Sequence, residues 1–428
     1  MATRLREIRL ASFKSVRDAR INVGPLTLVV GRNGSGKSNI LDAVSVLSAM
    51  ATGASLRDAL DGGREGPLVR GGSEGCAPVG ETRFAIGCSV DGAAGRLHLD
   101  VEVQTSPTVQ IVSERLWSYR GDGQRRYWLA SDPPNPHSAD ITARWESRKR
   151  GVNPPVTMRA DQLLTSQVAV RVPVTSQAGR DVHERAAEML SALNGVFLLD
   201  PVPHQMREYV PEKDAVLRRG ADNLSAVLGR IASNSVARQE LLDMTRSLSE
   251  AQVADLASVT SQLGDVMVTL TEHIGGEDRA IPARLMSDGT LRFLAIAAAL
   301  LEPMQGDAPA ERLLVVEELE NGLHPSQASL LVSRLKAAAG DRRVQTLATT
   351  HSPAILDSLD GSDHQDVVVV TRDADGWSRV TRLVDFPDYF EVVGPSTLGS
   401  RAVDDALRPG APDAGDVAQQ SLAEIFGS

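Results

Sequence analysis

The chain has 428 residues, of which 42 % are apolar and 23 % are charged, and its net charge at pH 7 is −10. The length predicts two or three lobes with a substantial core, and the negative charge disfavours a surface coated for duplex DNA, although it leaves room for a local basic patch. No apolar run is long enough to span a membrane, and the N-terminus lacks the features of a secretory signal. We therefore expect no membrane association and a cytoplasmic location. The two cysteines, Cys76 and Cys88, match no metal-ligand pattern.

The first 50 residues have the order strand, glycine loop, helix. Residues 5–29 show a loose apolar alternation that predicts two short strands around a turn. Residues 25–30 form a nearly continuous apolar run, which is typical of a central buried strand. From residue 38 to residue 50, apolar residues recur at helical spacing.

The middle of the chain is expected to contain a sheet and then a helical region. Residues 52–80 are glycine-rich and predict a loop, residues 81–130 alternate as in an antiparallel sheet, and the prolines of residues 131–165 predict a long exposed loop. Residues 181–272 show mainly helical patterns, interrupted near residues 195–220, and these are too short for an extended coiled coil.

The C-terminal part returns to alternating strands and helices over residues 282–357. Residues 366–370 predict a strand that turns at residues 373–376. After Pro387 the composition becomes acidic and rich in glycine and proline, which predicts a tail with a final short helix.

Residues 31–38 match all eight positions of the P-loop pattern. Glycines allow positive φ, so that backbone N–H groups turn inward around phosphate oxygens, and the following helix adds its positive dipole end. The Lys37 ammonium can reach the β- and γ-phosphates, and the Ser38 hydroxyl can take a Mg²⁺ position. A glycine turn that matches by chance is the alternative, which the flanking strand and helix disfavour. We expect ATP and Mg²⁺ to bind here, at residues Asn33, Gly34, Ser35, Gly36, Lys37, Ser38 and Asn39.

An acidic pair, Glu317 and Glu318, follows the apolar run of residues 312–316. Adjacent carboxylates at the exit of a core strand are costly unless they meet a cation or a water network. Beside a P-loop, we expect Glu317 to lie behind Mg²⁺ as its ligand, and Glu318 to face the attacking water as general base. Taken alone, such a strand end is more often a solvated edge.

A further short strand, residues 345–350, ends at His351. A lone histidine is more often structural than catalytic. This one closes a third strand of the same predicted sheet, at the edge where α/β proteins collect their ligands. We therefore keep His351 as a candidate functional residue.

Ser287, Asp288 and Gly289 directly precede a helical segment rich in leucine and alanine. By itself this is an ordinary helix start, with Ser287 as its N-cap. A helix N-terminus that follows small residues is also an anion site, so these residues are a second candidate for phosphate recognition.

Five motifs carry a family resemblance, namely residues 31–38, the stretch Ser287–Thr290, the strand end at Glu317, and residues 320–325 and 350–353. In this order they resemble the ABC-type ATPase heads of the SMC, RecF and OLD families, and most closely the short standalone predicted ATPases of that group. The similarity extends over residues 5–50, 195–230 and 282–356.

The resemblance implies an α/β fold of P-loop NTPase type and ABC-ATPase head class, with an antiparallel β subdomain and an inserted helical lobe. It implies slow ATP hydrolysis, with Glu318 as catalytic base and His351 as the switch histidine that senses the γ-phosphate. In this family the signature loop, here Ser287, Asp288 and Gly289, contacts the γ-phosphate bound to the opposite subunit, so that two sites form in a head-to-tail homodimer. We accordingly expect four parts, an N-terminal ATPase half (1–180), a helical lobe (181–275), a C-terminal ATPase half (276–390) and an acidic tail (391–428).

The chain departs from the family pattern at some points. Position 317 is Glu where many relatives have Asp, and the extra methylene shifts the Mg²⁺ contact. The glutamine of the Q-loop is not defined by the sequence, and Gln205 is only a weak candidate. The segment after His351 is expected to be too short for the metal-binding Toprim domain of OLD-type nucleases, so we do not expect this chain to cut nucleic acid.

The use made of ATP is less defined. Residues 115–150 hold three of the four tryptophans and more basic than acidic residues. Such a segment could stack bases or anchor a partner protein, although sheet packing beside a solvated basic loop is the simpler interpretation.

One hypothesis is an ATP-driven dimerising switch in DNA repair or defence against phage, with DNA as trigger. The other is an ATP-bound scaffold that restrains a separate effector, such as a nuclease or toxin. A metabolic small-molecule kinase is disfavoured by the signature and switch motifs.

Overall fold

The computed structural model describes residues 3–62, 69–135, 138–248, 252–302, 311–341, 344–394, 397–403 and 406–407. The strands are β1 (Arg4–Phe13), β2 (Val16–Asn22), β3 (Leu26–Val30), β4 (Arg83–Gly92), β5 (Gly95–Gln104), β6 (Gln110–Tyr119), β7 (Arg125–Ser131), β8 (Asp140–Trp145), β9 (Pro155–Arg159), β10 (Val196–Leu199), β11 (Val210–Pro211), β12 (Gln252–Thr260), β13 (Asp265–Ile274), β14 (Glu277–Pro282), β15 (Arg312–Val316), β16 (Val344–Thr349), β17 (Val367–Arg372) and β18 (Ser378–Arg382).

The α-helices are α1 (Lys37–Ala51), α2 (Leu56–Asp61), α3 (Val168–Arg171), α4 (Gln177–Asn194), α5 (Pro203–Met206), α6 (Leu224–Ala232), α7 (Ser235–Leu248), α8 (Asp288–Leu301), α9 (Ala328–Asp341), α10 (Pro353–Asp357), α11 (Tyr389–Val393) and α12 (Leu398–Val403). Short 3₁₀ turns add η1 (Glu74–Cys76), η2 (Thr165–Gln167), η3 (Ala283–Leu285), η4 (Pro325–Gln327), η5 (His364–Asp366) and η6 (Leu383–Asp385).

One sheet runs through most of the molecule, in the order β10-β15-β16-β3-β17-β18-β2-β1-β4-β5-β6-β7-β8-β9. In this sheet order, β10, β15, β16, β3 and β17 pair with one another in parallel. The strands β2, β1, β4, β5, β6, β7, β8 and β9 pair with one another antiparallel. The fold is therefore the expected α/β type, and the antiparallel β subdomain continues the same sheet. A second, smaller sheet contains β11 to β14.

Strand β15 shows why the central strands are apolar throughout. Leu313 and Val315 belong to one buried cluster together with residues of α1, whereas Leu314 and Val316 belong to a second cluster with residues of α8 and α9. Successive side chains of a strand point to opposite faces, so a strand covered by helices on both sides must be apolar at every position.

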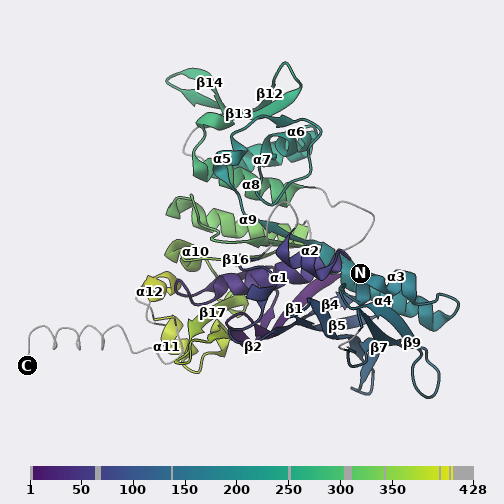
Figure 1. Ribbon diagram of the computed structural model, residues 1–428. Helices are drawn as coiled ribbons and strands as arrows, with labels where there is room; N and C mark the ends of the chain where they lie inside the picture. Colours follow the sequence, from purple (N-terminus) through teal and green to yellow (C-terminus); the bar gives the residue numbers. More distant parts are fainter. Residues whose placement is uncertain are drawn as a thin grey trace, which may run out of the picture.

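The upper lobe of the molecule in Figure 1 contains α5, α6, α7 and α8 together with β12, β13 and β14. Helix α9 lies between this lobe and α1. The antiparallel strands that follow β4 lie at the lower right of the picture, together with α3 and α4. Within the described ranges, no helix has both the length and the apolar composition required to cross a membrane.

Two expected loops contain regular structure. Helix α2 begins inside residues 52–80, where the Ser55 hydroxyl accepts a hydrogen bond from the Asp58 N–H at 3.1 Å. The prediction of a long exposed loop over residues 131–165 is wrong, because β8 and β9 extend the sheet there. Pro155 is the first residue of β9 at the edge of the sheet, where a missing N–H does little harm.

The helical prediction fails at the end of residues 181–272, where β12 and β13 form a hairpin. A register shift between Val253 and Asp255 interrupts the pairing, so that the buried side chains of β12, Val253 and Leu256, stand three residues apart. This spacing imitates a helix, since a β-bulge removes the period of two by which strands are recognised.

Part of the predicted acidic tail is packed. Val392 of α11 and Leu398 of α12 belong to a buried cluster with Val367 and Val369 of β17. Helices α11 and α12 therefore pack against β17 of the sheet. The predicted final short helix lies in residues 408–428, outside the described residues.

Candidate functional site

Three neighbouring parallel strands bring the predicted residues to one edge of the sheet. The P-loop follows β3, Glu317 and Glu318 follow β15, and His351 follows β16 after one intervening residue, while β16 pairs with both β15 and β3. The carboxyl ends of parallel strands meet at the same edge, which is where open α/β sheets bind ligands.

Glycines of the P-loop are required by conformation and by space. Gly31, Gly34 and Gly36 have φ values of 146°, 76° and 108°. A β-carbon at Gly31 would lie 2.2 Å from the carbonyl oxygen of Val370, and one at Gly36 would lie 2.2 Å from the Ser378 hydroxyl oxygen. Only glycine fits both restrictions, so the loop keeps its backbone close to its neighbours.

The loop is prepared for an anion. Lys37 Nζ donates hydrogen bonds to the carbonyl oxygens of Gly31 (2.8 Å) and Arg32 (2.9 Å), which hold the ammonium over the loop. Burial lowers the pKa of Lys37, and the negative charges of Glu318, Glu317 and Glu320 oppose this shift. The Ser35 hydroxyl is buried and has no hydrogen-bond partner in the described part of the chain. A buried hydroxyl in this state fits a phosphate oxygen.

Asn39, a predicted nucleotide contact, also supports the loop through a chain of hydroxyl groups. Its Nδ2 donates to the Ser15 hydroxyl at 2.8 Å, Ser15 is bonded to the Ser378 hydroxyl at 2.7 Å, and Ser378 Oγ donates to the Ser35 carbonyl oxygen at 2.5 Å. The roles of Ser15 and Ser378 could not be predicted from the sequence, because no local motif connects residues so far apart in the chain.

The side chains expected to hold Mg²⁺ already touch each other. The Ser38 hydroxyl donates a hydrogen bond to the Glu317 carboxylate. A hydroxyl and one carboxylate suit Mg²⁺, which prefers oxygen ligands and takes few from the protein when phosphates supply others. No cluster of three or more His, Cys, Asp or Glu residues suited to a metal occurs among the described residues.

Arg70 is a further residue that the sequence analysis missed. Its Nη2 donates to both carboxylate oxygens of Glu317, at 2.9 and 3.2 Å. A guanidinium therefore occupies the side of Glu317 where a cation is expected. Arg70 lies in a glycine-rich stretch without a motif, and only the folded chain brings it to Glu317.

The two remaining carboxylates differ in their bonding. Glu320 accepts hydrogen bonds from the Thr350 hydroxyl (2.8 Å) and from the backbone N–H of His351 (2.5 Å), so that both of its oxygens are engaged. Glu318 is exposed and accepts a single long bond, 3.3 Å, from the side-chain amide of Asn321. Its backbone is in the left-handed region at φ 52°, which is uncommon for a residue other than glycine and is found at functional sites.

His351 belongs to the same electrostatic cluster. Burial lowers the pKa of its imidazole, the positive charge of Lys37 lowers it further, and Glu320 and Glu318 oppose the shift. A lowered pKa favours the neutral ring at pH 7, which can both accept and donate a hydrogen bond.

The signature residues lie in the upper lobe, at the start of α8. The Ser287 hydroxyl accepts a hydrogen bond from the Thr290 N–H at 3.1 Å, so Ser287 is an N-cap, as the simpler interpretation predicts. In Figure 1, α8 and the P-loop helix α1 lie on opposite sides of α9. Gln205 is exposed on α5, in the same lobe as α8.

The chain matches the model of the family described as "AAA domain, putative AbiEii toxin, Type IV TA system" over residues 26–151 and 173–357, which is most of its length. It belongs to this AAA family. Together with the P-loop and the acidic strand end, family membership makes the chain an AAA-type ATPase.

Three solved structures of SMC heads are also similar to this AAA protein. The SMC head bound to the C-winged helix domain of ScpA shares 14 % identity at a TM-score of 0.49, covering 88 % of this chain and 97 % of that chain. The SMC head domain from Thermotoga maritima shares 14 % at a TM-score of 0.41 (89 % and 98 % covered). The head with an extended coiled coil bound to the C-terminal domain of ScpA derived from Pyrococcus furiosus shares 13 % at 0.47 (89 % and 96 %). No curated protein matches.

A cleft of about 600 Å³ opens beside the P-loop of this AAA protein. Ser15, Asn39, Arg70 and Trp377 are among the residues that line it. The indole of Trp377 is covered by the Arg17 guanidinium, which lies 3.7 Å from the ring centroid. The cleft leaves room next to the phosphate loop for the rest of a nucleotide.

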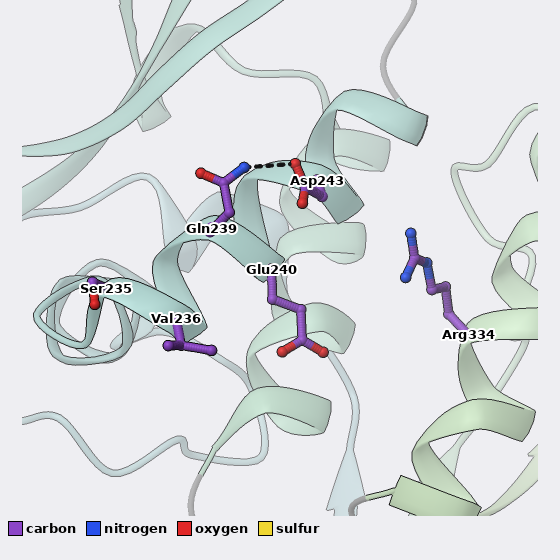
Figure 2. Close-up of a pocket in the computed structure, with 6 residues that line it drawn as sticks. All are labelled: Ser235, Val236, Gln239, Glu240, Asp243 and Arg334. Atoms are coloured by element: carbon purple, nitrogen blue, oxygen red, sulfur yellow. Dashed lines mark hydrogen bonds between the residues drawn. The ribbon is translucent and has the colours of Figure 1, made fainter.

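A second cleft, of about 450 Å³, lies between α7 and α9 (Figure 2). Gln239, Glu240 and Asp243 line it from α7, and Arg334 faces them from α9. None of the predicted nucleotide-binding residues is among the residues that line this cleft.

The tryptophans of residues 115–150 are packed. Trp117, Trp128 and Trp145 are 5 %, 7 % and 8 % exposed, in agreement with sheet packing. Tyr119, at 57 %, keeps an open face beside them. The aromatic content of this segment therefore serves mainly the fold.

Proposed function

We propose that this AAA-type ATPase binds ATP with Mg²⁺ at residues 31–38 and hydrolyses it in a head-to-tail homodimer. The observation that carries the proposal is the convergence of three strand ends, which places Lys37, Ser38, Glu317 and Glu318 at one edge of the sheet. This set provides a phosphate cradle, a metal position and an exposed carboxylate.

In the proposed binding mode, the P-loop amides, the Ser35 hydroxyl and the Lys37 ammonium hold the phosphates. Ser38 and Glu317 would hold Mg²⁺, which when bound neutralises charge on the phosphate oxygens. Neutral His351, beside Lys37, is suited to donate a hydrogen bond to the terminal phosphate.

Glu318 is the proposed general base. Glu317 is bonded to Ser38 and Arg70, and Glu320 is bonded to Thr350 and the His351 backbone. Of the three carboxylates, that of Glu318 is the exposed one with the weakest contact, so it is the most accessible to a water molecule.

The signature residues support the dimer. Ser287 caps a helix whose positive end suits an anion, and this helix lies in another part of the chain than the P-loop helix. A second copy of the chain, placed head to tail, would bring Ser287, Asp288 and Gly289 of one copy to the P-loop of the other.

ATP binding is tested by Lys37→Ala. The ammonium is held by loop carbonyls rather than by the core, so the variant should fold and yet lose ATP binding measured by calorimetry. Thermal unfolding provides the control for folding. Unchanged affinity in a folded Lys37→Ala variant would contradict the P-loop assignment.

For the biological role we propose an ATP-driven switch in DNA repair or antiphage defence. Mass photometry of Glu318→Gln with ATP, with and without DNA, tests this role. Stronger assembly of the ATP-bound dimer with DNA than with ATP alone is the expected result. A dimer that forms equally without DNA and copurifies with another protein would favour the scaffold for a separate effector.

A further inference from the structure

The signature turn contains an acidic residue at a place proposed to meet phosphate. Asp288 is the first residue of α8, and its side chain is 66 % exposed. A carboxylate suits a helix N-terminus, but it would repel the phosphate that this N-terminus is proposed to contact. The charge of Asp288 therefore has to be neutralised within its own chain.

Arg207, the residue directly after α5, neutralises the charge of Asp288. Its Nη2 donates to Asp288 Oδ1 at 2.6 Å and to the carbonyl oxygen of Met286 at 2.8 Å. The two acceptors, Met286 and Asp288, lie on either side of Ser287 in the chain, so the guanidinium holds the turn in place and also neutralises the Asp288 carboxylate. A guanidinium has five N–H donors, so Arg207 can hold Asp288 and still face an anion.

The opposite side of the turn is fixed by backbone packing. A β-carbon at Gly289 would lie 1.9 Å from the carbonyl oxygen of Gly322, in the loop that follows Glu318 and Glu320. The signature turn is thus held between Arg207, at the end of α5, and the loop that carries the proposed base. Its position depends on both.

We infer that Arg207 is a positioning residue of the composite site: it holds the signature turn and cancels the charge of Asp288, so that the turn can approach the phosphate of the second copy. This inference rests on the proposed head-to-tail dimer. It gives Arg207 a role in dimer formation, while ATP binding within one copy does not depend on Arg207.

The test measures ATP-induced association by mass photometry and ATP affinity by calorimetry, both in the Glu318→Gln background. Arg207→Ala should leave the affinity for ATP unchanged and weaken association about tenfold or more, as loss of a charged hydrogen bond predicts. Arg284→Ala is the matched control, since Arg284 is a neighbouring arginine that pairs with Glu208 at 3.5 Å outside the turn. This control should associate normally.

A charge-removal variant separates neutralisation from simple support. In the double variant Arg207→Ala with Asp288→Asn, no uncompensated carboxylate remains, so association should recover toward the level of the parent. Arg207→Ala that associates like Arg284→Ala would overturn the inference, and a double variant that does not recover would overturn its claim that Arg207 acts by cancelling the charge of Asp288. Absence of ATP-induced association in the Glu318→Gln parent itself would instead contradict the dimer on which the inference rests.

Discussion

Glu318 and Glu320 stand two residues apart, and their different bonding leads to opposite expectations. Glu318→Gln keeps the shape of the side chain but removes the base, so turnover should fall by about 100-fold or more while ATP binding persists. Glu320→Gln keeps one oxygen acceptor and replaces the other with an NH₂ donor, so it disturbs the pair of bonds from Thr350 and His351 and should act through stability and His351 position. Phosphate-release assays on both variants decide this. Normal turnover in Glu318→Gln, together with loss in Glu320→Gln, would show that the base is misassigned.

A carboxyl far from the P-loop also makes a testable contribution. Glu114 on β6 is fully buried and accepts hydrogen bonds from the N–H groups of Leu164 (2.7 Å) and Thr165 (2.6 Å) and from the Thr165 hydroxyl (2.6 Å). Burial raises its pKa from 4.5 to about 7, because desolvation outweighs these bonds. The Glu114 carboxylate thus caps η2, and its contribution to the free energy of unfolding depends on pH.

Because the pKa of Glu114 is higher in the folded state, its contribution to stability is complete below about pH 4.5 and is lost as the pH rises through about 7. The loss is on the order of 3 kcal/mol, at about 1.4 kcal/mol per pKa unit. Urea unfolding at several pH values should show the wild type losing stability relative to Glu114→Gln across this window. A constant difference between wild type and Glu114→Gln would contradict the assignment.

At the residue scale, the sequence identifies those site residues that belong to a local motif. The P-loop and the pair Glu317-Glu318 are of this kind, because glycine spacing and a strand exit are local features. Arg70, Ser15 and Ser378 are different, since their roles arise from contacts with residues far away in the chain. No periodicity or motif predicts such contacts.

At the element scale, the start of α8 depends on the close approach of two glycines. Gly289 lies inside α8, where its conformation is ordinary, so glycine is needed there for space against Gly322. Gly289→Ala should force the turn away from that loop and destabilise the fold by about 1–3 kcal/mol. Gly340→Ala on α9, where a β-carbon meets nothing within 4 Å, should instead stabilise by up to about 1 kcal/mol. Denaturant unfolding measures both, and equal effects would show that the Gly289 contact does not constrain α8.

Elements with an undisturbed period could be predicted, and interrupted ones could not. Helix α1 and strands β3, β15 and β16 follow the apolar patterns of the sequence closely. Strand β12 was missed because its bulge gives a helical spacing, and β8 and β9 were missed because prolines surround them. In both cases cross-strand pairing decides the structure, and pairing is a long-range property that a local window does not contain.

At the scale of the whole molecule, the helices that carry the two proposed phosphate-binding elements, α8 and α1, lie on opposite sides of α9 in Figure 1. The P-loop belongs to the sheet, whereas the signature turn belongs to the upper lobe. The order of motifs along the sequence does not show this arrangement. It is the feature that makes a two-copy site the simplest use of both elements.

The most direct test of the composite site is complementation between two inactive chains. Ser287→Arg should bind ATP as a monomer but neither associate nor hydrolyse, because the bulky cation blocks the helix N-terminus. Mixed with Lys37→Ala, it should regain hydrolysis, with up to one working site per heterodimer formed from the intact P-loop of one chain and the intact signature of the other. If Ser287 is only an N-cap, its loss costs about 1 kcal/mol and mixing restores nothing. Phosphate release from the mixture is therefore the decisive measurement: recovered activity is predicted, and zero activity with both variants folded and heterodimers present would contradict head-to-tail pairing.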